Sequence, residues 1–350
     1  MRLISRRRGR VCAAFGALAL AALSPLSIAA PSGTPPAQVV GGPKAAVPLD
    51  SPGGGVAIDL VGISDLHGYI ESTFHKNPET GEVDLNNVEN PGVTSLACQM
   101  SRAYRANPNT LFVSSGDNIG ASYYRSSTMN HDEGTLDILN RLRMDVSALG
   151  VHELDHGLGD LEGRVLPYTT FPMLAANVSG SDALSAEGDG RGIFIKEVDG
   201  VRVGFIGVVT DELPKLVSSS TRAQLTVAPA VATANARAAD LKDGDPANGE
   251  ADVVVVLSHE DAASTATSFS KNVDAVVAGR SHVSYAQTVT GVEGNQIAVV
   301  QPDHYGLKLG MVRLNYDRDT KKVSVVNVEN RDLKQEYCYE DDFGGVDIFS

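Results

Sequence analysis

Basic residues are scarce in this chain of 350 residues. Lysine and arginine total 29, against 43 aspartates and glutamates, which gives a formal net charge of −14 at pH 7. Five of the arginines lie within residues 1–29, where there is no acid, so the remainder carries a net charge of −19. So acidic a surface repels nucleic acid and anionic membranes unless a bound metal supplies positive charge. We therefore expect no nucleic-acid polymer as a partner.

Long apolar runs and cysteines are also scarce. The run Val11–Leu23 is too short to cross a bilayer and follows an arginine-rich segment, which is typical of a signal peptide. We expect cleavage after Ala29, export to the periplasm or the medium, and no membrane anchor. Only Cys98 and Cys338 then remain. They could form a disulfide in an oxidising compartment, but the acidic, glycine-containing segment around Cys338 favours two unpaired thiols.

Composition divides the rest of the chain into three segments. Residues 30–55 are rich in proline and glycine and are expected to form an extended linker. Residues 56–330 are long enough for one large domain with a sizeable core, and they show no internal repeat. Residues 331–350 are acidic and read as a short tail.

Strands and helices alternate along residues 56–330. Runs of β-branched apolar residues predict buried strands, and apolar positions at helical spacing predict helices. The predicted strands are 56–63, 111–115, 145–149, 172–176, 252–257, 273–278 and 297–300, with hairpins over 193–209 and 310–328 and helices over 91–106, 133–143 and 230–241.

Acidic and imidazole side chains follow five of these strands at the point where each strand ends. In a single sheet of buried parallel strands these ends would converge on one edge. Carboxylates and imidazoles are ligands of divalent metals, so we expect a metal site there. The residues are Asp65, His67, Asp117, His152, Asp155, His259 and His282.

The segment His152–His156 also matches H-E-x-x-H, which suggests a different enzyme. In zinc proteases a helix places both histidines of this motif on one face, and the glutamate acts as a general base. Gly150, Gly157 and Gly159 disfavour a helix here, and no obvious third ligand motif follows. A zinc protease therefore remains a remote alternative, and we expect His156 to be a surface residue.

The ordered motifs resemble those of the calcineurin-like metallophosphoesterases, and more closely those of secreted bacterial 5′-nucleotidases and 2′,3′-cyclic nucleotide phosphodiesterases. The resemblance covers residues 56–329. It implies an α/β fold, a four-layer αββα sandwich with mixed sheets, and a metal-dependent hydrolase of nucleotides or related phosphomonoesters and diesters. The motifs are Asp65-x-His67-Gly68, Gly116-Asp117, Gly150-x-His152-Glu153 followed by Asp155, Ser258-His259 and Gly279-x-x-His282.

The resemblance also assigns roles to these residues. It implies one or two divalent ions, of zinc, manganese, calcium or magnesium, with Asp65, His67 and His282 as ligands of the first. Asp117 would bridge the ions and His259 would bind the second. His152 would protonate the leaving oxygen, and Asp155 would orient His152. Metal coordination suits this reaction because it lowers the pKa of water and neutralises charge on phosphoryl oxygens.

Two positions depart from the family pattern, and both belong to the second metal site. Val151 stands where the family has asparagine, and Arg280 where it has histidine. Valine has no donor atom, and a guanidinium is a permanent cation that cannot bind a metal ion. We hypothesise that Arg280 pairs with Asp117 and offers its guanidinium to the phosphate in a catalytic role. The alternative is a binding domain on a catalytically impaired scaffold.

The family's nucleotidases carry a further domain whose aromatic side chains stack on the base, and residues 331–350 contain nothing comparable. The phosphoester chemistry is therefore expected in residues 56–330, while nucleotide specificity is left open.

Overall fold

The computed structural model describes residues 55–128, 131–336 and 338. The expected signal peptide and all but the last residue of the expected linker lie outside the described residues. No helix within the described ranges has the length and apolarity needed to cross a membrane.

The first of two large sheets contains the strands that precede Asp65, Asp117 and His152. Four of its strands run parallel, because the chain crosses over between them, and the two at one edge form an antiparallel hairpin. The strand order is β16 (Lys322–Asp332), β15 (Lys308–Asp317), β1 (Val56–Ile63), β4 (Thr110–Ser114), β5 (Val146–Ala148) and β6 (Met173–Leu174).

The second sheet contains the strands that precede His282 and end at His259. Its four central strands are parallel, and both edge strands are antiparallel to their neighbours. The order is β13 (Ser284–Thr290), β14 (Gln296–Pro302), β12 (Ala275–Ala278), β11 (Val253–His259), β9 (Val201–Val209) and β8 (Ile193–Val198). The five strand ends therefore come from two sheets and not from a single sheet.

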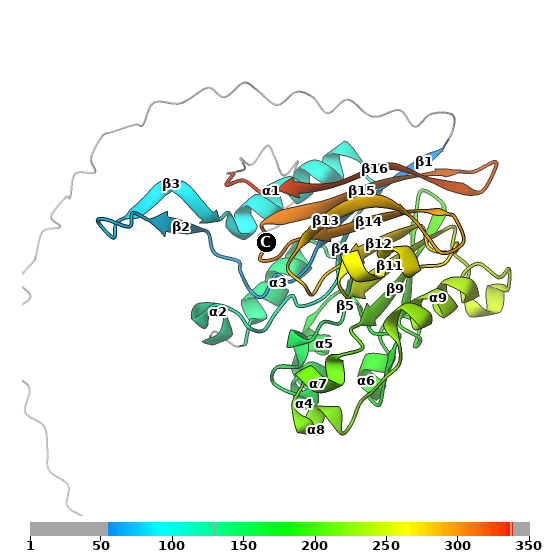
Figure 1. Cartoon of the computed structure of the whole chain (residues 1–350), viewed down its shortest axis with the longest axis horizontal. Helices are drawn as coiled ribbons and strands as arrows, with labels where there is room; N and C mark the ends of the chain where they lie inside the picture. Colours follow the sequence, from blue (N-terminus) through cyan, green and yellow to red (C-terminus); the bar gives the residue numbers. More distant parts are fainter. Residues whose placement is uncertain (1–54, 129–130, 337, 339–350) are drawn as a thin grey trace, which may run out of the picture. The chain divides into compact units, whose positions relative to one another are not determined.

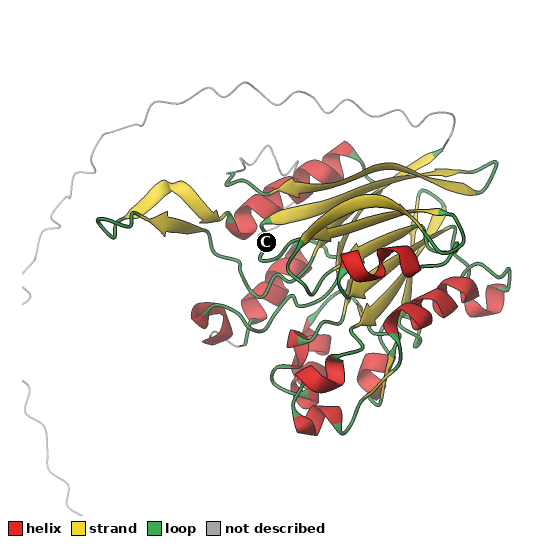
Figure 2. Ribbon diagram, in the orientation of Figure 1, coloured by secondary structure: helices red, strands yellow, loops and turns green. Residues whose placement is uncertain are grey.

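The two sheets pack face to face, and helices cover their outer faces (Figures 1 and 2). Val56, Ile58 and Leu60 of β1 face the second sheet, while Val61 and Ile63 pack with the helices α1 (Gly92–Ala106) and α3 (Glu133–Arg141). A strand buried on both faces is apolar at nearly every position, as this one is. The second sheet is covered by α9 (Ala230–Asp240) and α10 (Ala262–Thr265). The predicted αββα sandwich is confirmed.

Shorter elements connect these layers. A separate hairpin projects beside α1 in Figure 1 and consists of β2 (Thr73–Lys76) and β3 (Val83–Asn90). A 3-10 turn spans His152–Leu154 and a π-helical turn spans Leu161–Val165. The others are α2 (Tyr124–Thr128), α4 (Leu158–Asp160), α5 (Leu166–Tyr168), β7 (Val178–Ser179), α6 (Asp182–Ser185), α7 (Leu213–Leu216), α8 (Ser219–Arg222), β10 (Thr226–Val227), and 3-10 turns at Pro246–Asn248 and Ala266–Ser268.

The start of the expected tail packs on the domain. The boundary expected at residue 330 falls inside β16, and Leu333 is buried beside α1 and α3. Glu336 pairs with Arg102 of α1. The expectation of two free thiols is wrong, because Cys98 and Cys338 form a disulfide with their Cα atoms 5.6 Å apart. Leu333 packs beside α1 although it lies in an acidic segment, and Cys338 follows it closely enough to reach Cys98 of α1.

We expect the disulfide to stabilise the domain. A Cys98→Ser/Cys338→Ser double variant should lose about 2–4 kcal/mol of unfolding free energy, because the crosslink restricts the unfolded chain. Guanidinium denaturation measures this loss. A reductant should lower the unfolding free energy of the wild type to that of the variant and leave the variant's value unchanged. If the unfolding free energy of the wild type does not change with reductant, the prediction is wrong.

Candidate metal centre

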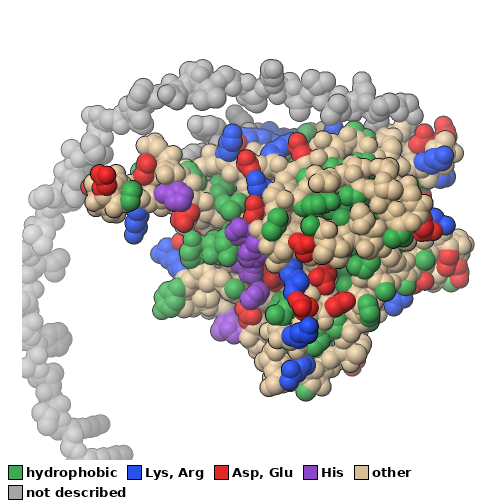
Figure 3. All heavy atoms as spheres, in the orientation of Figure 1, with side chains coloured by type: hydrophobic (Ala, Val, Ile, Leu, Met, Phe, Trp, Pro, Cys, Tyr) green, Lys and Arg blue, Asp and Glu red, His purple; other side chains and the backbone are tan. Residues whose placement is uncertain are grey.

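All the predicted site residues come together at the carboxyl ends of strands from both sheets. They surround a cavity of about 530 Å³. Histidine side chains gather on the face shown in Figure 3, next to acidic and basic side chains. Asp65 is fully buried beneath this surface. The cavity is lined by His67, Asp117, Ala121, Val151, His152, Asp155, Leu216, His259, Arg280, Ser281, His282 and Tyr305.

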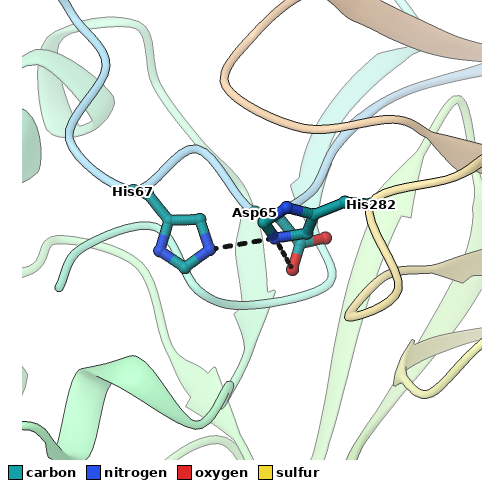
Figure 4. Close-up of side chains that lie close together, drawn as sticks. All are labelled: Asp65, His67 and His282. Atoms are coloured by element: carbon teal, nitrogen blue, oxygen red, sulfur yellow. Dashed lines mark hydrogen bonds and ion pairs between the residues drawn. The ribbon is translucent and has the colours of Figure 1, made fainter. Parts of the chain in front are cut away.

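One group of candidate ligands comprises Asp65, His67 and His282 (Figure 4). The Nε2 atoms of the two histidines lie 3.3 Å apart, and His282 Nε2 lies 3.6 Å from an Asp65 carboxylate oxygen. Nδ1 of His67 lies 2.8 Å from the carbonyl oxygen of Gly120, so this nitrogen carries the proton and Nε2 keeps its lone pair. Burial lowers the pKa of His67, which favours the neutral imidazole that binds metal.

A second group comprises Asp65, Asp117 and His259, whose ligand atoms lie within 4.8 Å of one another. His259 is fully buried, and its Nδ1 donates to the carbonyl oxygen of Ser115 at 2.9 Å. Its Nε2 lies 3.0 Å from an Asp117 carboxylate oxygen, but this buried atom has no hydrogen-bond partner of good geometry. A buried ring nitrogen that faces a carboxylate, with its other nitrogen held by a backbone carbonyl, suits a metal ligand.

The electrostatics of this pair also fit a cation. Burial lowers the pKa of His259, but the neighbouring Asp117 outweighs that effect and raises it to about 10. For Asp117 the signs are reversed: burial raises its pKa, but the neighbouring His259 and His67 outweigh burial and lower the pKa well below its usual range. The buried Asp117 carboxylate therefore stays ionised and needs a positive charge next to it, which here is a proton on His259. A divalent ion would satisfy the same need.

Several of these residues have strained backbone conformations. Asp65, His67, Asp117, Arg280 and His282 all have positive φ angles, between 49° and 75°. Side chains other than glycine rarely adopt this conformation, and it is concentrated at functional sites. Gly150 is required for another reason, since a Cβ there would lie 2.2 Å from an Asp117 carboxylate oxygen.

His152 and Asp155 form a pair at the exposed side of the cavity. His152 Nδ1 lies 3.0 Å from the Asp155 carboxylate, and this hydrogen bond raises the pKa of His152 to about 9. The backbone N–H of His152 donates to Asp117 at 2.7 Å.

The structure contradicts the helix that a zinc protease needs, since His152–Leu154 forms a single 3-10 turn. His156 is exposed, as expected, and its ring contacts that of His131.

The sequence named Glu153 as part of the Gly150-x-His152-Glu153 motif and as the base of a zinc protease, but it did not reveal the contacts of this residue. Its side chain is buried and accepts hydrogen bonds from the backbone N–H groups of Asp117, Asn118 and Gly150 at 2.7–3.1 Å. Glu153 therefore joins the loop after β4 to the loop after β5 and fixes the position of Asp117. Its burial depends on contacts between distant segments, so no local pattern could have shown it.

Arg280 lines the cavity, but its expected pairing with Asp117 is wrong. Its guanidinium donates to Glu212 and lies 3.5 Å from Glu260. Asp117 is paired with His259, and the Arg280 charge is balanced by Glu212 and Glu260. Val151 is buried in an apolar cluster and offers the site no donor.

Comparisons with known proteins connect this site to phosphoesterases. No family model matches the chain. It is 31% identical over 236 residues to the cell wall protein Lmo0130 of Listeria monocytogenes, an alignment covering 60% of this chain and 28% of the relative. It is 26% identical over 303 residues to the trifunctional nucleotide phosphoesterase protein YfkN of Bacillus subtilis, covering 75% and 20%. The human 5′-nucleotidase is 24% identical over 290 residues, covering 76% and 48%.

The structural comparison agrees in fold. The calcineurin-like phosphoesterase YfkN from Bacillus subtilis superposes with a TM-score of 0.63 and 20% identity, covering 83% of this chain and 96% of that structure. The resemblance to 5′-nucleotidases and calcineurin-like phosphoesterases is confirmed. This chain spans about half the length of the human relative and less than a third of the two bacterial ones.

We expect the hydrogen bond with Asp155 to control the protonation of His152. In the metal-free protein His152 should titrate near pH 9, and Asp155→Asn should move the midpoint towards 6.5. Because the folded-state pKa is raised, the stability this pair contributes is complete below about pH 6.5 and is lost as the pH rises through 9. NMR titration of the imidazole measures the midpoint. Asp160→Asn, which removes a partner of Arg164, is the control and should leave it unchanged.

Proposed function

We propose that this chain, whose relatives and structural neighbours are 5′-nucleotidases and calcineurin-like phosphoesterases, is an exported metal-dependent hydrolase of phosphoric esters. Its substrates would be nucleotides or related phosphomonoesters and diesters. The observation that carries the proposal is the convergence of three overlapping groups of metal-ligand atoms on one cavity, with the buried His259 Nε2 among them 3.0 Å from Asp117. The similarity to a cell wall protein supports export.

Each candidate ligand has a defined part in this proposal. Asp65, His67 and His282 would hold a divalent ion with Asp117, while His259 would remain the buried partner of Asp117. A divalent ion supplies a water-derived nucleophile at neutral pH and positive charge for the phosphoryl oxygens. Zinc, manganese, calcium and magnesium are all candidates. The imidazoles of His67 and His259 are oriented before any ion binds, because the carbonyl oxygens of Gly120 and Ser115 accept their Nδ1–H groups.

His152 would act as the general acid. Its Nδ1 is engaged by Asp155, so the proton available for the leaving oxygen is on Nε2. The raised pKa keeps the imidazolium populated at neutral pH, as a proton donor requires. Asp155 also accepts the N–H of Ala121, so it holds the ring from a fixed position.

The second metal site is altered in this proposal. Val151 adds no ligand, and Arg280 adds a positive charge to the cavity wall in place of a ligand. We propose a one-metal esterase in which Arg280 provides part of the charge that a second ion would supply. The pairing of Arg280 with two glutamates favours a second candidate function, an impaired scaffold that binds phosphate esters without turnover.

Asp117→Ala should abolish hydrolysis. We expect the purified protein, given Mn²⁺, Zn²⁺ or Ca²⁺, to hydrolyse p-nitrophenyl phosphate, its bis ester or 5′-AMP. The variant should lose at least about a hundredfold in kcat, since the Asp117 carboxylate lies 3.0 Å from His259 and 3.9 Å from His67. Release of p-nitrophenol or phosphate is the readout. Asp319→Ala, in the exposed turn between β15 and β16, is the control and should keep full activity. Failure of the wild type to hydrolyse any of these esters would favour the binding domain.

Restoring the family residues should restore the second ion. We expect elemental analysis to find about one tightly bound ion per wild-type chain and about two in Val151→Asn/Arg280→His, because the substitutions add an amide oxygen and an imidazole beside Asp117 and His259. Two tightly bound ions in the wild type would contradict the one-metal proposal, whatever the activity.

A further inference from the structure

We propose that Glu212 is a latch that holds the Arg280 guanidinium in the cavity wall, so that an anion entering the cavity must displace Glu212 to bind Arg280. The inference rests on the proposed function in one respect only, that the entering anion is a phosphoryl group. Glu212 is thereby a positioning residue that sets the affinity of the site for anions.

The main chain of Arg280 cannot move freely. Its N–H donates to both carboxylate oxygens of Asp65, at 3.0 and 3.1 Å, and its φ is 75°. The next residue, Ser281, is held through its hydroxyl by Asp261 and Gln301. A change in the position of the guanidinium must therefore come from rotations within the Arg280 side chain, which is 28% exposed and lines the cavity.

The two carboxylates that hold this side chain differ in mobility. Glu260 is fixed, since its side chain is mostly buried and also accepts the backbone N–H of Asp211 at 3.0 Å. Glu212 is about half exposed and precedes the short helix α7. It has a second cationic partner, Lys215, 3.5 Å away, so it remains paired when it releases Arg280. Glu212 is thus the contact that can open.

A phosphoryl group competes directly with Glu212. A guanidinium has five N–H groups, and those that Glu212 occupies are not available to a phosphoryl oxygen at the same time. If only a fraction of molecules have Arg280 released, the apparent affinity for every anion that uses Arg280 falls by that fraction. A half-exposed ion pair of this kind corresponds to a factor of about two to five.

The test measures binding of inorganic phosphate by calorimetry to the full chain with Mn²⁺ present, so no turnover is required. We compare the wild type with Glu212→Gln, Arg280→Gln and the double variant. Glu212→Gln should bind phosphate about two- to fivefold more tightly than the wild type, while the same substitution should have no effect when Arg280 is already glutamine. Glu293→Gln removes an exposed glutamate that pairs with Lys271 and serves as the matched control, with unchanged affinity.

Two results would overturn the latch. One is an unchanged phosphate affinity in Glu212→Gln, and the other is an equal gain in the Arg280→Gln background, which would show only a loss of negative charge near the cavity. If the wild type hydrolyses esters while Glu212→Gln binds phosphate with unchanged affinity, the latch is overturned and the proposed hydrolase is left intact. A protein without turnover that shows the Arg280-dependent gain would support the latch and contradict the proposed hydrolase.

Discussion

The buried carboxylate of Asp117 is the group on which the rest of the site depends. One of its oxygens lies 3.0 Å from His259 and 3.9 Å from His67, and the other accepts the backbone N–H of His152. The carboxylate thus contacts residues from β11, from the end of β1 and from the loop after β5. An ionised group so deeply buried is stable only where positive charge and hydrogen-bond donors surround it. Those requirements explain the imidazoles beside it. The buried Glu153 acts differently, because it holds the loop of Asp117 by accepting backbone N–H groups.

The sequence predicted the buried strands of this fold but not the exposed strands β2, β3 and β13. The run from Val56 to Ile63 became β1 with the same bounds, and the hairpin expected over 193–209 is formed by β8 and β9. Buried parallel strands have such uniform apolar sequences that their existence is clear, while their assignment to one sheet or two is not. The strand ends alone therefore suggested a single sheet, and the two-sheet arrangement came from the family resemblance.

The candidate ligands could be picked out of the sequence because metal chemistry restricts the side chains that can serve. Asp65, His67, Asp117, His259 and His282 meet as expected. The partners of these residues were less predictable. Glu153, Glu212 and Glu260 act through contacts with residues distant in sequence, so their hydrogen-bond and ion-pair partners could not be inferred from the local sequence. The disulfide was missed for the same reason, because Cys98 and Cys338 are separated by 240 residues.

The ligand groups come from two sheets that share a single apolar interface. Asp65 and His67 follow β1 of the first sheet, whereas His259 ends β11 and His282 follows β12 of the second. An ion held by both sets is a crosslink between the sheets, in addition to being a cofactor. Since an unfolded chain has no such preformed group, binding of the ion draws the equilibrium towards the closed sandwich. The metal concentration outside the protein would then set the lifetime of the folded state as well as the rate of hydrolysis.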